Sequence, residues 1–155
     1  MDTLFAAILQ FFPEEAWPGF RDDEHSVLQV KFQGQNGRWD CFAQAREEQR
    51  QFVFYSVCPV NAPVEKRPAV AELLTRANYG LVMGNLEMDF SDGEIRYKTS
   101  VDVDGDRLSM ALIRQVVYAS HAAFLIALPR ARLMASILLL SSPPSARMTK
   151  ENRPL

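Results

Sequence analysis

The stretch SVLQVKFQGQNGRWDCFAQAREEQRQFVFYSVC, residues 26–58, contains the pattern that decides the fold. Its first part alternates apolar Leu28, Val30 and Phe32 with polar residues, which is the period of a half-buried β-strand. Residues 34–37, Gly-Gln-Asn-Gly, then have the composition of a tight hairpin turn. The return strand carries its apolar side chains on one face, at Trp39, Cys41, Ala43 and Ala45. The sequence therefore predicts an antiparallel hairpin.

The last part of this stretch, residues 51–58, predicts a third strand that is apolar on both faces. Phe52, Phe54 and Ser56 alternate there with Val53, Tyr55 and Val57. Such a strand either lies between two covering layers or leaves one apolar face exposed. We therefore mark it as a candidate contact surface.

The flanking sequence predicts three helices and a second hairpin. Apolar residues recur at helical spacing over 4–12, behind Asp2 or Thr3 as N-cap and before Pro13. A second helical pattern lies between Pro63 and Asn78, with Pro68 in its first turn. Two alternating runs, 81–90 and 94–103, flank Asp92-Gly93, a tight-turn signal. A long helix begins after Asp106 or Ser109 as cap and breaks at Pro129, with a short continuation through Leu133, Ile137 and Leu140.

The expected fold is α+β: a helix, three antiparallel strands, a helix, a two-strand hairpin and a long C-terminal helix. We expect one domain over residues 1–140. Residues 141–155 contain three prolines and scattered charges, a composition typical of a disordered tail.

The composition excludes several classes of protein. A chain of 155 residues with 48% hydrophobic residues buries a core without needing disulfides or a structural metal. The formal charge of -2 disfavours a nucleic-acid binder, which normally carries a basic surplus. The N-terminus has no positive signal-peptide region, and Pro129, Arg130 and Arg132 interrupt the apolar run 122–140. We expect a cytoplasmic protein with no membrane segment.

The candidates for catalysis or metal binding are weak. Asp102, Asp104 and Asp106 surround Gly105, but the order does not fit an EF-hand loop, so a turn and a helix cap are expected instead. Cys41 and Cys58 form no CxxC pair and are expected to be reduced and buried. His25 falls in a polar loop and His121 on a helix, and neither has a nucleophile beside it. We predict a protein that is not an enzyme and that has no metal and no cofactor.

Several short motifs between Val64 and Tyr97 resemble the YbjN-domain family, bacterial proteins labelled as sensory transduction regulators with a fold similar to type III secretion chaperones. The matching motifs are Val64-Glu65-Lys66-Arg67, Val70-Ala71-Glu72-Leu73-Leu74, Asn78-Tyr79, Gly84-Asn85-Leu86-Glu87, Asp92-Gly93 and Ile95-Arg96-Tyr97. The resemblance covers about residues 4–135, where Trp39 and Leu108-Ser109 also fit it.

The matching residues have structural uses. Asn78 is suited to end a helix, Gly84 to relieve crowding in a strand, and Asp92-Gly93 to make a turn. The family-motif structural residues are Asn78, Tyr79, Gly84, Asn85, Asp92 and Gly93. By analogy with the secretion chaperones, the resemblance implies a homodimeric binding or regulatory module that holds a partner segment on helix and sheet surfaces.

Two functional hypotheses follow. The first is a non-enzymatic module that binds an unknown protein partner on an apolar helix and sheet surface. Its candidate partner-binding residues are Phe5, Phe12, Trp17, Phe20, Val53 and Tyr55, although filling the core is an equally good role for each. The second is a small-molecule sensor or enzyme with a pocket between the sheet and the long helix, where Tyr55, Tyr97 and Cys58 supply polar contacts.

Overall fold

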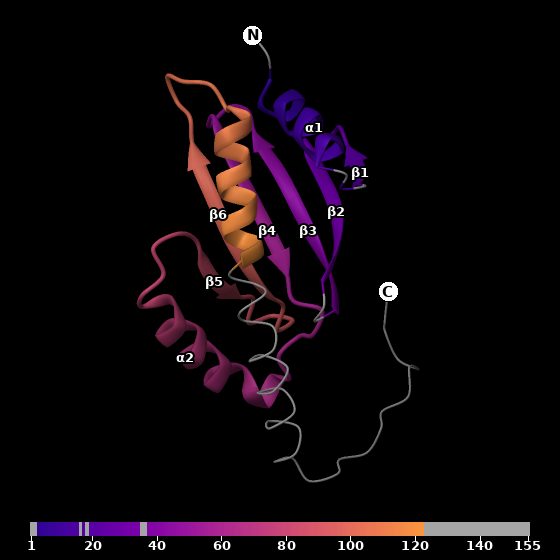
Figure 1. Cartoon of the computed structure of the whole chain (residues 1–155). Helices are drawn as coiled ribbons and strands as arrows, with labels where there is room; N and C mark the ends of the chain where they lie inside the picture. The colour runs from indigo at the N-terminus through magenta and orange to yellow at the C-terminus, as the bar shows by residue number, and fades with distance from the viewer. Residues whose placement is uncertain (1–2, 16, 18, 35–36, 123–155) are drawn as a thin grey trace.

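The computed structural model describes residues 3–15, 17, 19–34 and 37–122. The helices are α1 (Leu4–Glu14), the short 3-10 helix η1 (Val64–Lys66), α2 (Arg67–Asn78) and a helix over residues 110–122 (Figure 1). The strands are β1 (Gly19–Asp22), β2 (Val27–Gly34), β3 (Gly37–Arg46), β4 (Gln51–Val57), β5 (Asn85–Met88) and β6 (Ile95–Asp102).

The strands form one antiparallel sheet in the order β1-β2-β3-β4-β6-β5. This confirms the α+β class. The expected helix break at Pro129, the continuation to Leu140 and the tail 141–155 lie outside the described residues.

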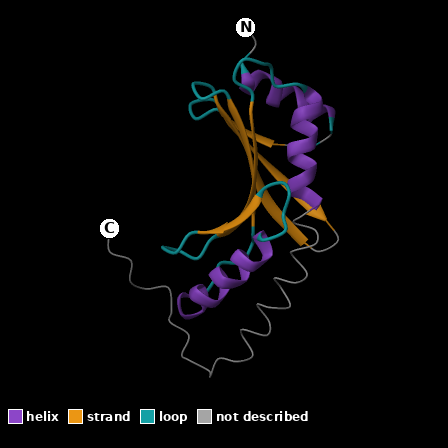
Figure 2. Ribbon diagram, turned by 90° about the vertical axis from the view of Figure 1, so that its left-hand side faces the viewer, coloured by secondary structure: helices purple, strands orange, loops and turns teal. Residues whose placement is uncertain are grey.

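The alternation in residues 26–58 assigns one face of the sheet to the core. Val30 pairs with Cys41 and Cys41 with Ser56, so the side chains of these three residues share a face. Helix α1 and the helix over 110–122 lie on this side of the sheet, as the edge-on view in Figure 2 shows. The predicted period was therefore correct, and its apolar members form the core.

Small side chains on β3 make room for the large side chains of α1. Ala43 pairs with Phe54, and Ala45 with Phe52, so each bulky ring of β4 has a small neighbour. Phe12 fills the space above them, and its ring stacks on Phe54 at 6.1 Å between centroids. The rings of Phe12, Phe52 and Phe54 are fully buried, which fixes α1 over this part of the sheet.

A carboxylate from the turn between β3 and β4 caps helix α1. The Leu4 N–H donates to Glu47 Oε2 at 3.0 Å, and the Phe5 N–H donates to Oε1 at 2.8 Å. Thr3 Oγ1 accepts from the Ala6 N–H at 3.1 Å, confirming Thr3 as N-cap. The first N–H groups of a helix have no partner within the helix, and a negative charge there is stabilising.

Buried hydroxyl groups hold the helix over 110–122 against the sheet. Ser56 Oγ and Ser120 Oγ lie 2.9 Å apart, and Thr99 Oγ1 donates to the Val116 carbonyl at 2.9 Å. Cys41 Sγ lies 3.4 Å from Ser56 Oγ. Burial raises the pKa of the Cys41 thiol to about 12, so this thiol is neutral at physiological pH. Ser109 Oγ accepts from the Leu112 N–H, which confirms the predicted cap.

Asn78 closes the edge of the sheet at β5. Its amide nitrogen donates to the Leu86 carbonyl at 2.9 Å, and its amide oxygen accepts from the Leu86 N–H at 2.8 Å. Asn78 is the last residue of α2, as expected, and its φ is not positive. Its side chain pairs with the backbone of Leu86 as a neighbouring strand would, which satisfies these two backbone groups at the edge of the sheet.

Gly84, directly before β5, has φ +71°, and a Cβ on it would lie 2.6 Å from the Lys98 carbonyl oxygen. Only glycine tolerates that approach. The close approach fits the expected role of Gly84 in relieving crowding, but the residue lies just before the strand and not within it.

Three details differ from the sequence prediction. Strand β1 was missed because Gly19–Asp22 is short, polar and without alternation. Pro13 lies inside the last turn of α1, which ends at Glu14, two residues later than expected. Asp92-Gly93 does not form a two-residue hairpin turn, because Met88 pairs with Ile95 and residues 89–94 make a longer loop. Gly93 is still needed there, with φ +81° and a virtual Cβ 2.2 Å from the Ala62 carbonyl oxygen.

The cap at α1 generates a first prediction. Replacing Glu47→Gln removes the charge and turns an N–H toward a backbone donor, so we expect a loss of about 1–2 kcal/mol in unfolding free energy. Urea denaturation followed by circular dichroism measures it. Glu48→Gln, at the exposed neighbouring position, is the matched control and should change stability by less than about 0.5 kcal/mol. Equal effects of the two substitutions would contradict the cap.

The edge contact at β5 generates a second prediction. In Asn78→Asp the side chain still accepts from the Leu86 N–H but no longer donates to its carbonyl. We expect a loss of about 1–2 kcal/mol in urea denaturation, because the carbonyl loses its donor and faces a negative charge. Asn61→Asp is the control, since Asn61 makes only a 3.4 Å exposed contact. An Asn78→Asp protein as stable as this control would rule out the role assigned to Asn78.

Candidate functional site

The face of the sheet opposite α1 and the helix over 110–122 is here called the open face. None of the described helices crosses it in the edge-on view of Figure 2. Side chains that alternate with the core positions lie on this face. From β2 to β6 they include Val27, Gln29, Phe42, Gln44, Val53, Tyr55, Val57, Arg96 and Lys98.

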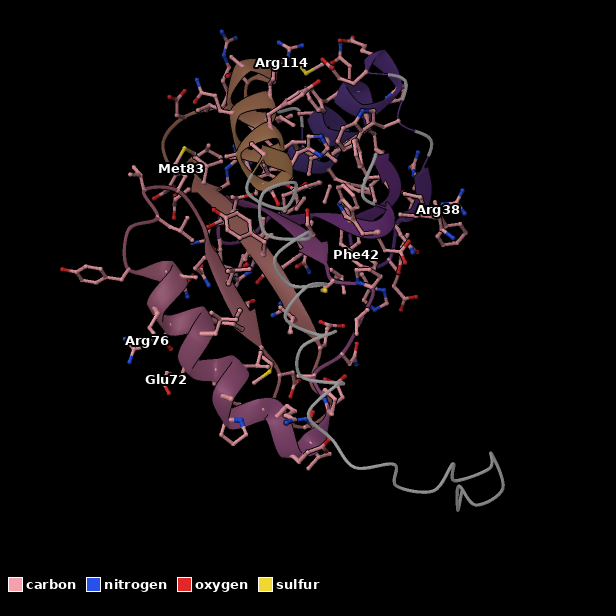
Figure 3. The ribbon with its side chains drawn as sticks, turned by 60° about the horizontal axis from the view of Figure 1, so that its bottom comes forward. Arg38, Phe42, Glu72, Arg76, Met83 and Arg114 are labelled. Atoms are coloured by element: carbon pink, nitrogen blue, oxygen red, sulfur yellow. The ribbon has the colours of Figure 1, made fainter. Side chains whose placement is uncertain are left out.

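A hollow of about 300 Å³ lies on the open face. Its lining residues are Val27, Phe42, Gln44, Tyr55, Val57, Glu94 and Arg96. Phe42 and Tyr55 are directly paired neighbours on β3 and β4, so two half-buried aromatic side chains lie side by side at its centre. Figure 3 shows Phe42 between the strands, well away from Glu72 and Arg76 on the outer side of α2. The hollow therefore combines an apolar centre with a polar margin.

Charged side chains on β5 and β6 form that margin. Arg96 Nε lies 2.6 Å from Glu87 Oε1, and Lys98 Nζ lies 2.8 Å from Glu87 Oε2. Burial disfavours the charged form of Glu87, but the hydrogen bonds from Lys98 and Arg96 outweigh it and hold the pKa of this carboxyl below its usual range. The Arg96 guanidinium also lies over the Tyr55 ring, 4.5 Å from its centroid.

These contacts define what the open face can do. Arg96 forms an ion pair with Glu87 and lies 3.9 Å from Glu94, and apart from Arg96 and Glu94 the lining of the hollow consists of hydrocarbon, phenol and amide groups. The lining holds no pairing of a nucleophile with a base, which covalent catalysis needs. The arrangement is suited to binding an apolar surface with polar contacts at its edge.

The structure separates the six candidate partner-binding residues. Phe5 and Phe12 are buried in the core under α1. Trp17 belongs to an aromatic cluster and lies 5.0 Å from Phe32 between ring centroids. Phe20 projects from the edge strand β1 and is 72% exposed. Val53 and Tyr55 lie on the open face, so they alone among the six are brought together there.

Phe42, Val27 and Val57 contribute to the open face but were not among the sequence candidates. The side of β3 that carries Phe42 is otherwise polar, with Asp40 and Gln44 beside it. A lone aromatic on the polar side of a strand, next to a strand apolar on both sides, is the signal that would have found it.

The three residues proposed for a pocket under the long helix do not converge. Tyr55 lies on the open face, whereas Tyr97 pairs with Ser56 and lies on the core face. The Tyr97 hydroxyl donates to the Met83 carbonyl, and Cys58 is buried. The space between β4, β6 and the helix over 110–122 is filled by Ser56, Thr99 and Ser120.

The remaining candidates are structural or exposed. Asp102 accepts from the Asp104 N–H and from Gln51, so it closes a turn. His25 pairs with Asp22 at 2.9 Å on the surface. The His121 ring lies 3.9 Å from Phe32 between centroids, and burial lowers its pKa. Within the described chain, no group of three potential ligands is placed to hold a metal ion.

The other family-motif residues lie around β5. Asn85 contacts Glu87 at 3.4 Å, and Asp92 Oδ1 accepts from the Glu94 N–H. Tyr79 opens an exposed apolar loop that continues through Leu81, Val82 and Met83.

None of the helices over the described ranges is long and apolar enough to cross a bilayer.

Comparisons with known proteins agree with this architecture. The crystal structure titled "Crystal structure of YbjN, a putative transcription regulator from E. coli" superposes with a TM-score of 0.64 and 11% sequence identity. The match covers 84% of this chain and 92% of that one, and at this identity it shows a shared fold. No curated protein matches the sequence. The model of the YbjN family, described as "Putative bacterial sensory transduction regulator", matches residues 5–125. Since this match spans most of the 155 residues, the chain belongs to the YbjN family.

Proposed function

We propose that this chain is a non-enzymatic regulatory module that binds a segment of a protein partner on the open face of its sheet. The observation that carries the proposal is the paired Phe42 and Tyr55 in a hollow that no described helix covers. The family description as a regulator of sensory transduction supports a binding role. The free thiols Cys41 and Cys58 agree with a cytoplasmic setting, where thiols stay reduced.

Leaving the apolar side chains of this face in water costs free energy. Val53 is nearly covered by its neighbours, but Val27, Val57, Phe42 and Tyr55 each keep part of their surface exposed. A partner that covers these residues gains roughly 25 cal/mol for each Å² of apolar surface removed from water. A sheet whose second face is polar, as is common for antiparallel sheets, would not offer this gain.

The margin of the hollow indicates the kind of partner. Glu87 and Glu94 are balanced by Arg96 and Lys98, so the margin carries no net charge to attract a polyanion. Arg96 is also held between Glu87 and the Tyr55 ring. A short segment with two or three apolar side chains on one side fits such a surface, as in other groove-binding modes.

Photo-crosslinking tests the proposal. We expect that replacing Phe42 by the photoreactive analogue p-benzoylphenylalanine, in the full chain expressed in its native host, yields one discrete crosslinked protein on irradiation. Adding Tyr55→Glu should reduce that product by about tenfold, because it buries an unpaired charge in the contact. Thermal unfolding of the same variant checks that the fold is retained.

The control position is Arg76, whose exposed side chain lies on the outer side of α2 (Figure 3). The same analogue at Arg76 should give no such product. A product formed from Tyr79 but not from Phe42 would assign the contact to the exposed loop before β5 and contradict the proposal. A crosslinked dimer of this chain would identify a second copy as the occupant, in agreement with the homodimer expected from the family resemblance.

A further inference from the structure

Strand β1 forms one edge of the sheet, beside β2 (Figure 1). Gly19, Phe20 and Arg21 on this strand are exposed, and Phe20 keeps 72% of its surface in water. At the opposite edge the Asn78 side chain already takes the N–H and carbonyl of Leu86. An exposed edge strand is a template for pairing with another strand.

The backbone groups of β2 turn alternately to its two neighbouring strands. The Ala45 N–H donates to the Ser26 carbonyl at 2.9 Å, so Ser26 turns its backbone toward β3. Because hydrogen-bonded and non-hydrogen-bonded positions alternate in an antiparallel ladder, Val27 and Gln29 turn their backbone groups toward β1. These two residues therefore make the hydrogen bonds that hold β1 in place.

The same alternation decides which backbone groups of β1 point outward. Asp22 and Phe20 are the β1 partners of Val27 and Gln29 in the register, so Asp22 and Phe20 bond to β2. The N–H and carbonyl groups of the residues on either side of Phe20 point the other way. Within the described part of the chain, no backbone group pairs with these outward groups.

A second copy of β1, placed antiparallel and centred on Phe20, matches these outward groups. Gly19 of one copy then lies opposite Arg21 of the other, where the two residues exchange both backbone hydrogen bonds, and the exchange occurs twice by symmetry. Gly19 has no side chain, so it leaves room for the Arg21 side chain opposite. Phe20 meets Phe20 of the second copy at a non-hydrogen-bonded position, where opposite side chains come closest and an aromatic pair is stabilising.

Charge favours the antiparallel arrangement over a parallel one. The acidic residues 22–24, Asp-Asp-Glu, end β1 and follow it. Antiparallel pairing about Phe20 keeps Asp23 of the two copies roughly 20 Å apart along the strands, which is beyond the screening length of about 8–10 Å. Parallel pairing would place the two acidic runs side by side. The charge of Arg21 is balanced within its own copy by the ion pair with Asp23.

The helices of the core face do not obstruct such a pair. Helix α1 contacts β2 and β3, and in a joined sheet the two β2 strands are separated by three strand spacings, roughly 14 Å. Packed helices lie about 8–10 Å apart. The two α1 helices therefore clear each other.

We propose that two copies of this chain join antiparallel through the outer edges of β1, with Phe20 against Phe20, to form one continuous sheet. The twofold axis is perpendicular to the sheet, so both open faces lie on the same side. Phe42 and Tyr55 lie two and three strands inward from β1 and stay uncovered. A partner with two copies of the bound segment then occupies both hollows at once, a consequence that rests on the proposed function.

Sedimentation velocity of the full chain tests the dimer. We expect a concentration-dependent shift from monomer to dimer, because so short a ladder makes a weak interface. Phe20→Lys sets like charges opposite each other and should raise the dissociation constant at least about tenfold. Val82→Lys is the matched control, since Val82 is an apolar residue of the loop before β5 and is 97% exposed. It should leave the dissociation constant unchanged.

Two results of this measurement would overturn the proposal. One is a chain that stays monomeric up to about 0.5 mM. The other is an equal effect of Phe20→Lys and Val82→Lys on the dissociation constant. Thermal unfolding of both variants checks that each monomer retains its fold.

Disulfide trapping tests the register independently. Cysteines at Phe20→Cys have Cα atoms about 4.5 Å apart in the paired strands, within the range of a disulfide. Cysteines at Arg21→Cys lie on a diagonal of roughly 8 Å, which is too long. The native Cys41 and Cys58 are buried. We therefore expect Phe20→Cys to form covalent dimers about tenfold faster than Arg21→Cys under mild oxidation.

Equal trapping rates from Phe20→Cys and Arg21→Cys would overturn the proposal. Trapping from Phe42→Cys in place of Phe20→Cys would also overturn it, by placing the second copy on the open face. The dimer needs no partner segment, so a dimer through Phe20 with no photo-crosslink from Phe42 contradicts the proposed function alone. A photo-crosslink from Phe42 to another protein, in a chain that stays monomeric, contradicts the dimer alone.

Discussion

The layer of aromatic rings between the sheet and its helices is the constraint on which the rest of the structure depends. Phe11, Phe12, Phe52 and Phe54 are all fully buried, and the small side chains of Ala43 and Ala45 leave the space that they fill. Because protein interiors are close-packed with few voids, these rings fit together only when α1 lies at one position over the sheet. The Glu47 carboxylate at the N-terminus of α1 fixes that position from the turn between β3 and β4. The core face of the sheet is thereby fully covered by side chains and helix.

The other face follows from the same strands. Because side chains alternate, a strand that supplies Phe52 and Phe54 to the core supplies Val53 and Tyr55 to the opposite side. At the sheet's β5 edge, Asn78 already pairs with the backbone N–H and carbonyl of Leu86, so these two groups are not available to an added strand. The apolar surface that remains is the open face, with Phe42 and Tyr55 at its centre. Function is therefore proposed for the side of β4 that the core does not use.

Much of this fold could be predicted from residues 26–58, because strand period and turn chemistry are local properties. For that reason the predictions were correct for the two hairpin strands, the apolar third strand and the Ser109 cap. Strand β1 could not be found, since its pairing with β2 depends on tertiary contact and its own sequence is polar. The loop at 89–94 was missed because Gly93 is needed where the backbone passes close to Ala62. Local sequence does not show this tertiary contact.

The site was predicted less completely than the fold. The both-sided apolar pattern identified Val53 and Tyr55 correctly as side chains of one surface, but burial of Phe5 and Phe12 depends on where α1 packs. Photo-crosslinking in the native host tests the central claim most directly, since Phe42 lies in the hollow on the open face. The account predicts a discrete crosslinked product from this position and none from Arg76 on the outer side of α2. Equal crosslinking from the two positions, or none from Phe42, would contradict it.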